Sequence, residues 1–297
     1  MNEFPHLRAD ACAMLALTDE DRINAMLNDQ WIGYPRARQI LDRMEELFNH
    51  PRVLRPPNLL VIGRTNNGKT QILKRFRKLH PASDNIGEDA INVPVVYVQA
   101  PPVPDEKRLY ADILNVIFSK YSVSDHPHKL FANLKNKFQT IGVRLLIIDE
   151  LNSLVSGSMT KQRQFLTVLK HMSNELQIPM VGAGTEDAMR ALQTDPQLSN
   201  RFTPMNLSRW GMTVEFRKLL ASCEQMLPLR YPSNLSEKGI AHEIWSRSEG
   251  TIGETVTLLR EAAKQAMRTG QEKIDLKMLD TCGFDAPSAR KKRLAEV

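Results

Sequence analysis

The sequence predicts an α/β fold in which helices cover a parallel sheet, followed by a smaller all-helical region. Short apolar segments alternate with amphipathic segments over the first two thirds of the chain, a pattern typical of strands joined by crossover helices. One segment, Val143–Ile148, is almost continuously apolar, as expected for a central strand buried on both faces. After about Gly211 the strand pattern ends, so we expect the remaining chain to be helical.

The first 55 residues are predicted to be helical. Thr18 is followed by three acidic residues, which is typical of a helix N-terminus. A second, amphipathic helix is expected from about Arg36 to Phe48, with its apolar residues on one face. A short apolar turn, Trp31–Pro35, separates the two helices.

The middle of the chain is expected to contain five strands. Prolines 101, 102 and 104 prevent the second strand from continuing, because proline cannot donate a backbone hydrogen bond. Helices are expected after the first strand, from about Asp105 to Tyr121 and from about His128 to Thr140. The strands are expected at residues 59–62, 93–98, 143–148, 178–184 and 205–207.

The C-terminal region is expected to form four helices, at about residues 212–226, 236–248, 253–269 and 275–281. A basic run, Arg290–Arg293, follows Pro287 and indicates a disordered tail, which either contacts DNA or an acidic partner or is only solvated. We therefore expect an N-terminal helical segment (1–55), an α/β domain (56–210), an α-helical domain (211–283) and a basic tail (284–297).

The composition is that of an ordinary globular chain. The sequence has 297 residues, of which 42% are hydrophobic, and a net charge of +6, which fits a polyanionic partner without requiring one. The longest apolar run is too short to cross a membrane, so we expect no membrane association. The three cysteines are far apart in the sequence and form no metal-binding spacing. They indicate reduced thiols in a cytoplasmic protein.

The segment after the first predicted strand has the phosphate-binding pattern of a P-loop, G-x-x-x-x-G-K-T. The glycines let the backbone approach the phosphates, and the loop N–H groups and the helix N-terminus favour an anion. Lys69 is expected to reach the β- and γ-phosphates and the Thr70 hydroxyl to bind Mg²⁺. The strand–loop–helix context argues against a chance match, so we predict binding of ATP with Mg²⁺. The motif residues are Gly63, Arg64, Thr65, Asn66, Asn67, Gly68, Lys69 and Thr70.

Two carboxylates, Asp149 and Glu150, follow the third predicted strand. Ligands of open parallel sheets bind at the carboxyl ends of the strands. Asp149 is therefore expected to point at the Mg²⁺ held by Thr70, and Glu150 to polarise an attacking water. The alternative is an acidic pair on the surface, which the upstream P-loop makes less attractive.

Two further residues are candidates for sensing or stabilising the γ-phosphate. Thr185 follows the fourth strand, which we expect beside the first, and could contact the phosphate or the water; it could also be the N-cap of the next helix. Arg201 precedes the fifth strand and is a candidate arginine finger toward the nucleotide of a neighbouring subunit, because guanidinium binds phosphate in a bidentate manner. The alternative for Arg201 is a surface residue or an interface ion pair.

These motifs together resemble the AAA+ ATPases, and more specifically the TniB/TnsC group of transposition ATPases. The resemblance covers roughly residues 20–280, is more distant to MuB and IstB, and is carried by Trp31–Tyr34, Asn66–Thr70, Leu146–Glu150 and Gly182–Thr185. It implies a P-loop AAA+ fold with a three-layer parallel sheet and a C-terminal all-α lid. It also implies ATP-dependent assembly into a ring or filament on double-stranded DNA, recruitment of a DDE transposase, a TniQ-like adaptor as partner, and disassembly on hydrolysis.

The residues that would contact adenine and DNA are less sharply defined. In many P-loop ATPases a segment upstream of the loop holds the adenine, so Tyr34 is a candidate, although its turn could serve only for packing. In an AAA+ ring, loops after the second and third strands face the pore, which favours DNA contacts from Lys107, Arg108, Lys161 and Arg163. Each of these four could instead lie on a solvated helix face.

The sequence departs from the AAA+ pattern in the lid. Such lids often carry a phosphate-sensing arginine in a Gly-x-x-Arg turn, but the matching turn, Gly250–Gly253, ends in glycine. Arg260 lies two turns further along the predicted helix. We therefore expect hydrolysis to be slow or to depend on partners.

Three functions are compatible with a P-loop ATPase of this kind. The first is an oligomeric, DNA-bound ATPase that regulates transposition. The second is a helicase loader or other DNA-associated AAA+ ATPase, which would use the same chemistry on a different client. The third, a signalling NTPase switch without nucleic acid, is disfavoured because small switches lack both the lid and an arginine such as Arg201.

Overall fold

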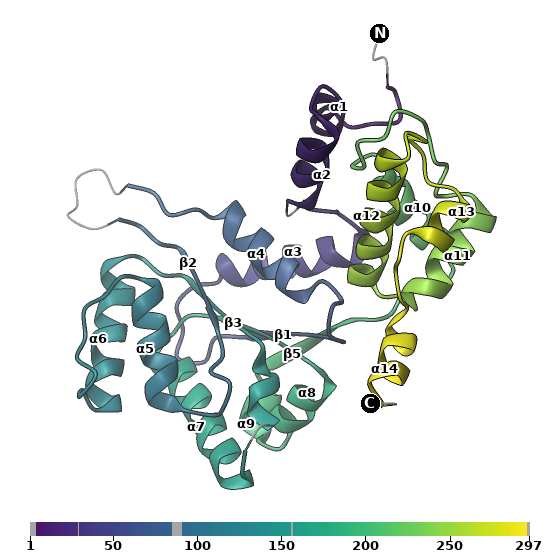
Figure 1. Cartoon of the computed structure of the whole chain (residues 1–297). Coiled ribbons are helices and arrows are strands. Elements are labelled where there is room, and N and C mark those ends of the chain that lie inside the picture. Colours follow the sequence, from purple (N-terminus) through teal and green to yellow (C-terminus); the bar gives the residue numbers. More distant parts are fainter. Residues whose placement is uncertain (1–3, 29, 85–90, 156, 296–297) are drawn as a thin grey trace. The chain divides into compact units, whose positions relative to one another are not determined.

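The computed structural model describes residues 4–28, 30–84, 91–155 and 157–295 (Figure 1). By its internal contacts the chain forms two compact units. The helical unit comprises residues 1–34, 66–68 and 209–297, and the α/β unit comprises residues 35–65 and 69–208.

The α/β unit is built on a five-stranded parallel sheet with the strand order β2-β3-β4-β1-β5. All five predicted strands are present, with ends that differ from the predicted ones by at most three residues. The fourth strand does pair with the first. The strands are β1 (Asn58–Gly63), β2 (Val95–Gln99), β3 (Leu145–Asp149), β4 (Met180–Gly184) and β5 (Phe202–Leu207).

The three central strands, β1, β3 and β4, are buried at every position, which explains their nearly continuous apolar sequences. Two polar residues are buried with them, Asp149 at the end of β3 and Asn58 at the start of β1. Asn58 is fully buried. Its side-chain oxygen accepts a hydrogen bond from Met180 N (2.8 Å), and its amide donates to Ser173 Oγ (3.3 Å). A buried amide is tolerated because it is paired, and here it fixes the start of β1 against β4.

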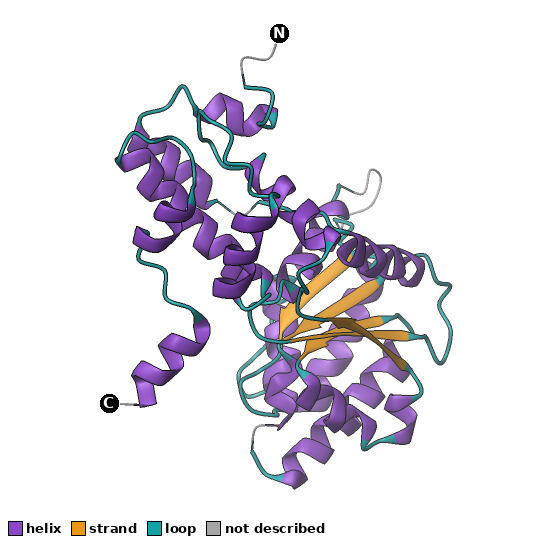
Figure 2. Cartoon of the chain, turned by 90° about the vertical axis from the view of Figure 1, so that its right-hand side faces the viewer, coloured by secondary structure: helices purple, strands orange, loops and turns teal. Residues whose placement is uncertain are grey.

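Helices cover both faces of the sheet (Figure 2). Leu60, Ile62, Leu146 and Ile148 point to one face, where they form a single apolar core with the helices from α5 to α9. Helices α3 and α4 pack against each other and against β1. The helices are α3 (Pro35–Phe48), α4 (Lys69–Leu79), α5 (Glu106–Val116), α6 (Pro127–Thr140), α7 (Met159–Leu176), α8 (Glu186–Gln193), α9 (Pro196–Ser199) and the short 3-10 helix η1 (Leu151–Val155).

The helical unit joins the N-terminus of the chain to its C-terminal third. The buried Arg22 on α2 makes two hydrogen bonds to the Glu272 carboxylate (3.1 and 2.5 Å), and α2 packs on α12. The predicted N-terminal segment of 55 residues is therefore divided after Tyr34 between the two units. The helices of this unit are α1 (Ala9–Met14), α2 (Asp19–Leu27), α10 (Val214–Glu224), α11 (Lys238–Ser248), α12 (Ile252–Arg268), α13 (Leu276–Thr281) and α14 (Pro287–Ala295).

The basic tail was predicted to be disordered, and this prediction was wrong over Pro287–Ala295, which form helix α14. The helix starts at a proline, which is favourable in a first turn. Its first turn is held by Ser288 N, which donates to Glu249 Oε1 (2.7 Å). Among the described residues of the whole chain, no helix is long and apolar enough to cross a membrane.

Candidate nucleotide-binding site

Lys69 is the first residue of α4 and lies at the end of the P-loop. Its ammonium donates to the carbonyl oxygens of Gly63 (2.8 Å) and Arg64 (2.9 Å), and the side chain is almost completely buried. Burial lowers the pKa of Lys69, and the nearby carboxylates of Glu150 and Asp149 oppose this shift. A charged phosphate is a stronger partner for an ammonium than a carbonyl, so the lysine is well placed to bind one.

The predicted metal ligands are adjacent in the structure. Thr70 Oγ1 donates to Asp149 Oδ2 over 2.7 Å. Neighbouring ligands of an octahedral Mg²⁺ at its usual bond lengths lie about 2.9 Å apart. The hydroxyl and carboxylate oxygens therefore fit the spacing and the ligand preference of this ion.

Tyr97 on β2 was not found from the sequence as part of this site. Its hydroxyl also donates to Asp149 Oδ2 (2.8 Å), which orients the carboxylate. Burial raises the pKa of Tyr97, and Asp149 raises it further, so the phenol remains a donor at neutral pH. The signal that could have indicated it is a hydroxyl-bearing residue between the valines of the strand that pairs with β3.

Glu150 follows β3 with a left-handed backbone conformation (φ 57°), which is costly for a residue other than glycine. Asn152 on η1 donates to Glu150 Oε2 (2.6 Å) and accepts from Thr185 N (2.6 Å). Asn152, also missed in the sequence, thus connects the predicted catalytic base with the predicted sensor. Thr185 is the N-cap residue of α8, as one of the two predictions had it, but its side chain makes no capping hydrogen bond. Capping therefore gives the Thr185 hydroxyl no partner.

The middle of the P-loop, Asn66–Gly68, belongs by its contacts to the helical unit. Gly253 N at the start of α12 donates to Asn66 O (3.0 Å), and Asn66 Nδ2 donates to Glu254 Oε1 (3.0 Å). A Cβ atom on Gly253 would lie 2.6 Å from Asn66 O and would collide with the Asn66 side-chain oxygen. An arginine therefore has no room at position 253, which gives the departure from the AAA+ lid pattern a steric reason.

Tyr34 lies beside the same part of the loop. A Cβ atom on Gly68 would be 3.6 Å from the Tyr34 hydroxyl, and the Tyr34 ring packs edge-on against Trp210 with centroids 5.2 Å apart. Burial raises the pKa of Tyr34 to about 12. Tyr34 therefore has a packing role, and its position next to the loop leaves the adenine role as a prediction.

Arg201 is held away from Lys69 within its own chain. Arg201 O accepts from Asn58 N (2.8 Å) at the start of β1, whereas the P-loop follows the end of that strand. Its guanidinium donates to Asn174 Oδ1 (2.7 Å), and burial followed by the charge of Arg55 lowers the pKa of Arg201. An interaction of Arg201 with a nucleotide would therefore have to involve another subunit.

The four predicted DNA contacts differ in their surroundings. Lys107 donates to Val123 O (2.7 Å). Arg108 Nε lies 3.8 Å from Asp112 Oδ2. Arg108 and Glu150 both line a pocket of about 480 Å³. Lys161 and Arg163 are exposed on the first turns of α7. Of the four, these last two are therefore the freest to contact a phosphate backbone.

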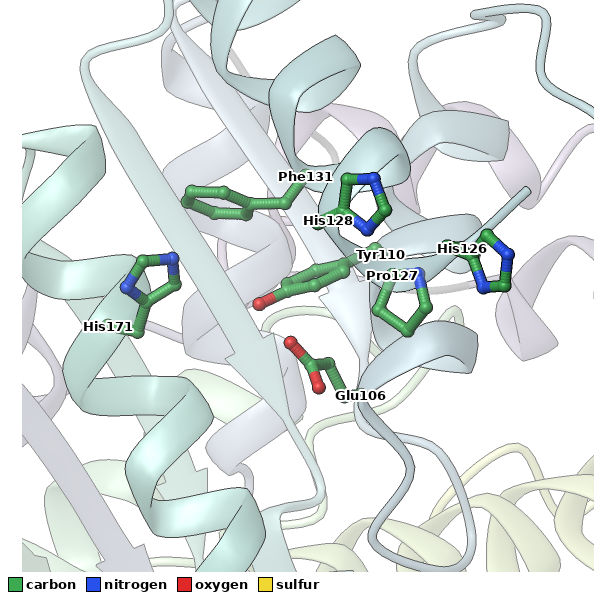
Figure 3. A pocket seen from close by; sticks show the side chains of 7 residues that line it. All are labelled: Glu106, Tyr110, His126, Pro127, His128, Phe131 and His171. Carbon is green, nitrogen blue, oxygen red and sulfur yellow. The ribbon is translucent and has the colours of Figure 1, made fainter.

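A shallow pocket of about 530 Å³ lies between α5, α6 and α7 (Figure 3). His126 and His128 stack with centroids 5.8 Å apart on one side of Tyr110, and His171 lies on the other side. The histidines do not converge on a common point, and nowhere in the described part of the chain do three or more His, Cys, Asp or Glu residues form a group that could hold a metal ion. The pocket is separate from the P-loop.

Solved structures share the fold across most of the chain. The ORC2 protein of Aeropyrum pernix, solved in ADPNP–ADP complexes, has a TM-score of 0.61 at 15% identity and is matched over 92% of this chain and 74% of that one. The ORC1 protein of the same organism, solved in complex with DNA, has a TM-score of 0.60 at 17% identity over 90% and 68%. A point variant of RuvB from Thermotoga maritima has a TM-score of 0.52 at 14% identity over 91% and 72%.

These likenesses establish the fold, which is that of the P-loop AAA+ ATPases with a helical C-terminal region. None of the curated proteins matches the chain in sequence. The profile of the family described as "Bacterial TniB protein" matches residues 22–212, which is more than half of the chain and includes the P-loop, Asp149, Glu150 and Thr185. The chain therefore belongs to the TniB family.

Proposed function

We propose that this protein is a Mg²⁺-dependent ATPase that assembles on double-stranded DNA and regulates DNA transposition. The observation that carries the ATPase part is the Thr70–Asp149–Glu150 arrangement. A P-loop hydroxyl and a strand-end carboxylate lie 2.7 Å apart, and the next residue is a second carboxylate. Phosphoryl transfer needs mainly positioning and charge stabilisation, and this arrangement offers both.

The residues divide the reaction between them. Lys69 would exchange its two carbonyl partners for the β- and γ-phosphates, and Thr70 and Asp149 would hold Mg²⁺, which neutralises charge that develops on the phosphates. Glu150 accepts the proton of the attacking water. Asn152 holds the Glu150 carboxylate and the Thr185 backbone in one geometry, which supports a common role in orienting that water.

The position of Arg201 supports assembly into an oligomer. Because Arg201 lies at the start of β1 rather than at the P-loop end of the sheet, it would reach a nucleotide only in a neighbouring subunit. A ring or filament places each arginine at the next subunit's site, so that hydrolysis depends on assembly. Asn174 would release the guanidinium when the neighbour docks.

DNA binding is supported by charge and by the fold. The net charge is +6, and Lys161 and Arg163 present exposed cations on α7. The structural relative ORC1 was solved in complex with DNA. Membership of the TniB family supports transposition as the process, with a DDE transposase and a TniQ-like adaptor as partners.

The test is DNA binding by the purified protein with ATP, with ADP and with a non-hydrolysable ATP analogue, with electron microscopy of the same samples. ATP-dependent rings or filaments on duplex DNA are expected. A monomer that binds nucleotide but ignores DNA in every state would overturn the DNA-binding part and leave a protein-directed ATPase. Capture of a DDE transposase rather than a hexameric helicase separates the transposition regulator from a helicase loader.

A further inference from the structure

The contact between α12 and the P-loop contains a carboxylate, Glu254, next to Gly253, the position where the AAA+ pattern has an arginine. Glu254 lies in the first turn of α12, and its side chain is only 11% exposed. One of its oxygens accepts from Asn66 Nδ2 of the P-loop. A buried carboxylate beside a loop that binds a polyphosphate would repel that ligand unless its charge is balanced.

The balancing charge comes from outside the lid helices. Arg290 on α14 donates through Nη2 to the second oxygen of Glu254. Helix α14 is positioned for this by Ser288 N, which donates to Glu249 Oε1, and the Arg290 guanidinium also lies 6.0 Å from the Phe284 ring centroid. The carboxylate of Glu254 is thus shared between the P-loop on one oxygen and the C-terminal helix on the other.

We propose that Arg290 is a positioning residue for nucleotide binding, which acts through Glu254 on Asn66 of the P-loop. It supplies from the C-terminal helix the positive charge that Gly253 excludes from the lid turn. Asn66 needs this support because its backbone is left-handed (φ 61°), and its two bonds, from Gly253 N and to Glu254, hold that conformation. The inference rests on the proposed nucleotide-binding function.

Two consequences follow from the geometry. Without Arg290, Glu254 keeps a negative charge that has lost its ion-pair partner, so the carboxylate disfavours phosphates near Asn66. If Glu254 is replaced by glutamine, the amide oxygen can still accept from Asn66 but carries no charge, so Arg290 is no longer needed. The effect of removing Arg290 therefore depends on the charge at position 254.

The experiment measures the dissociation constant of a fluorescent ADP analogue for the full chain and five variants. These are Arg290→Ala, Arg290→Lys, Glu254→Gln, the double variant of Arg290→Ala with Glu254→Gln, and Lys292→Ala as a matched control that removes a tail charge two residues away. Arg290→Ala is expected to weaken binding about tenfold, within the usual range of coupling between sites. Lys292→Ala should bind like the unmodified protein, and Arg290→Lys should recover most of the affinity.

The double variant decides between positioning and a general structural role. Affinity near that of Glu254→Gln alone supports the inference, because the loss then depends on the carboxylate charge. Unchanged affinity in Arg290→Ala, or an equal loss in both backgrounds, would overturn it, and thermal unfolding without nucleotide shows whether each variant folds. If Arg290→Ala does not fold, Arg290→Gln replaces it in both backgrounds, and an equal loss of affinity with Glu254 and with Glu254→Gln would again overturn the inference. Failure of the unmodified protein to bind nucleotide would instead count against the proposed function.

Discussion

The two halves of the P-loop are held in different ways. The half that leads into α4 is satisfied locally, because Lys69 bonds to two loop carbonyls and Thr70 bonds to Asp149 at the end of β3. The middle of the loop is held by the lid helix α12, through Asn66, Gly253 and Glu254. Local contacts thus hold the half of the loop that leads into α4, whereas residues distant in the sequence hold the conformation of its middle.

The largest effect is expected for Lys69→Ala, which removes the ammonium group from the half of the P-loop that leads into α4. We expect nucleotide binding to become undetectable, because no other residue of the loop offers an ammonium to the phosphates. Isothermal titration with ATP measures this, and an unchanged melting temperature without nucleotide controls for folding. Tight binding of ATP by this variant would show that the half of the P-loop that leads into α4 does not bind the phosphates.

Arg201→Ala should lower ATP turnover by about a thousandfold if the residue acts as an arginine finger, while each chain still binds ATP. The reason is that Arg201 lies away from the P-loop end of its own chain and would complete a neighbour's site. Turnover measured over a range of protein concentrations, together with mass photometry, checks this. Unchanged activity would mean that Arg201 has only a structural role, through its hydrogen bond to Asn174.

Glu150→Gln should reduce turnover at least about a hundredfold, as for loss of a general base, without loss of nucleotide or DNA binding. The amide keeps the shape and can still accept from Asn152, but it takes no proton from water. Persistent assemblies after ATP addition are expected by electron microscopy. Normal turnover in this variant would refute the assignment of Glu150 as the base.

Gly253→Ala tests the half held by the lid. Its new methyl group would collide with Asn66, so we expect a loss of about 1–3 kcal/mol in the free energy of unfolding, as for overpacking, together with weaker nucleotide binding. Gly239→Ala in α11 is the matched control, because a Cβ there meets nothing within 4 Å, and alanine favours the helix by roughly 0.5–1 kcal/mol. Denaturant unfolding of both variants measures the difference in their free energies of unfolding. Equal values would mean that α12 shifts at little cost to accommodate the methyl group.

The smallest effect is expected for Tyr97→Phe, which removes one of the two donors to Asp149 Oδ2. Since Thr70 remains, we expect the free energy of Mg²⁺ binding to weaken by about 0.5–1.5 kcal/mol, which is typical of one hydrogen bond. The measurement is the Mg²⁺ concentration needed for half-maximal turnover, which should rise a few-fold. A larger loss than that of Thr70→Ala would mean that Tyr97, rather than the motif threonine, dominates the orientation of Asp149.

The fold and the half of the P-loop that leads into α4 could be predicted from the sequence, because the patterns that indicate them span only a few residues. Apolar segments indicated all five strands, although β5 begins three residues before its predicted start, and the P-loop spacing predicted that Lys69 and Thr70 open a helix. The direct bond between Thr70 and Asp149 also follows from a general rule, since the carboxyl ends of parallel strands meet at one edge of the sheet. Asn152 and Tyr97 were missed because each acts through side-chain hydrogen bonds that no residue spacing encodes.

The positions of the strands, the P-loop motif and the acidic pair could be read from the residues alone, because periodicity and short motifs reflect backbone geometry over a few residues. Three-dimensional packing established that α2 joins the C-terminal helices through Arg22 and Glu272, residues 250 positions apart, and that α14 is a helix. It also decided that Asn66, Glu254 and Arg290 form one connected set. Ion pairs and hydrogen bonds between distant residues depend on where packing brings the side chains, and residue spacing carries no record of that.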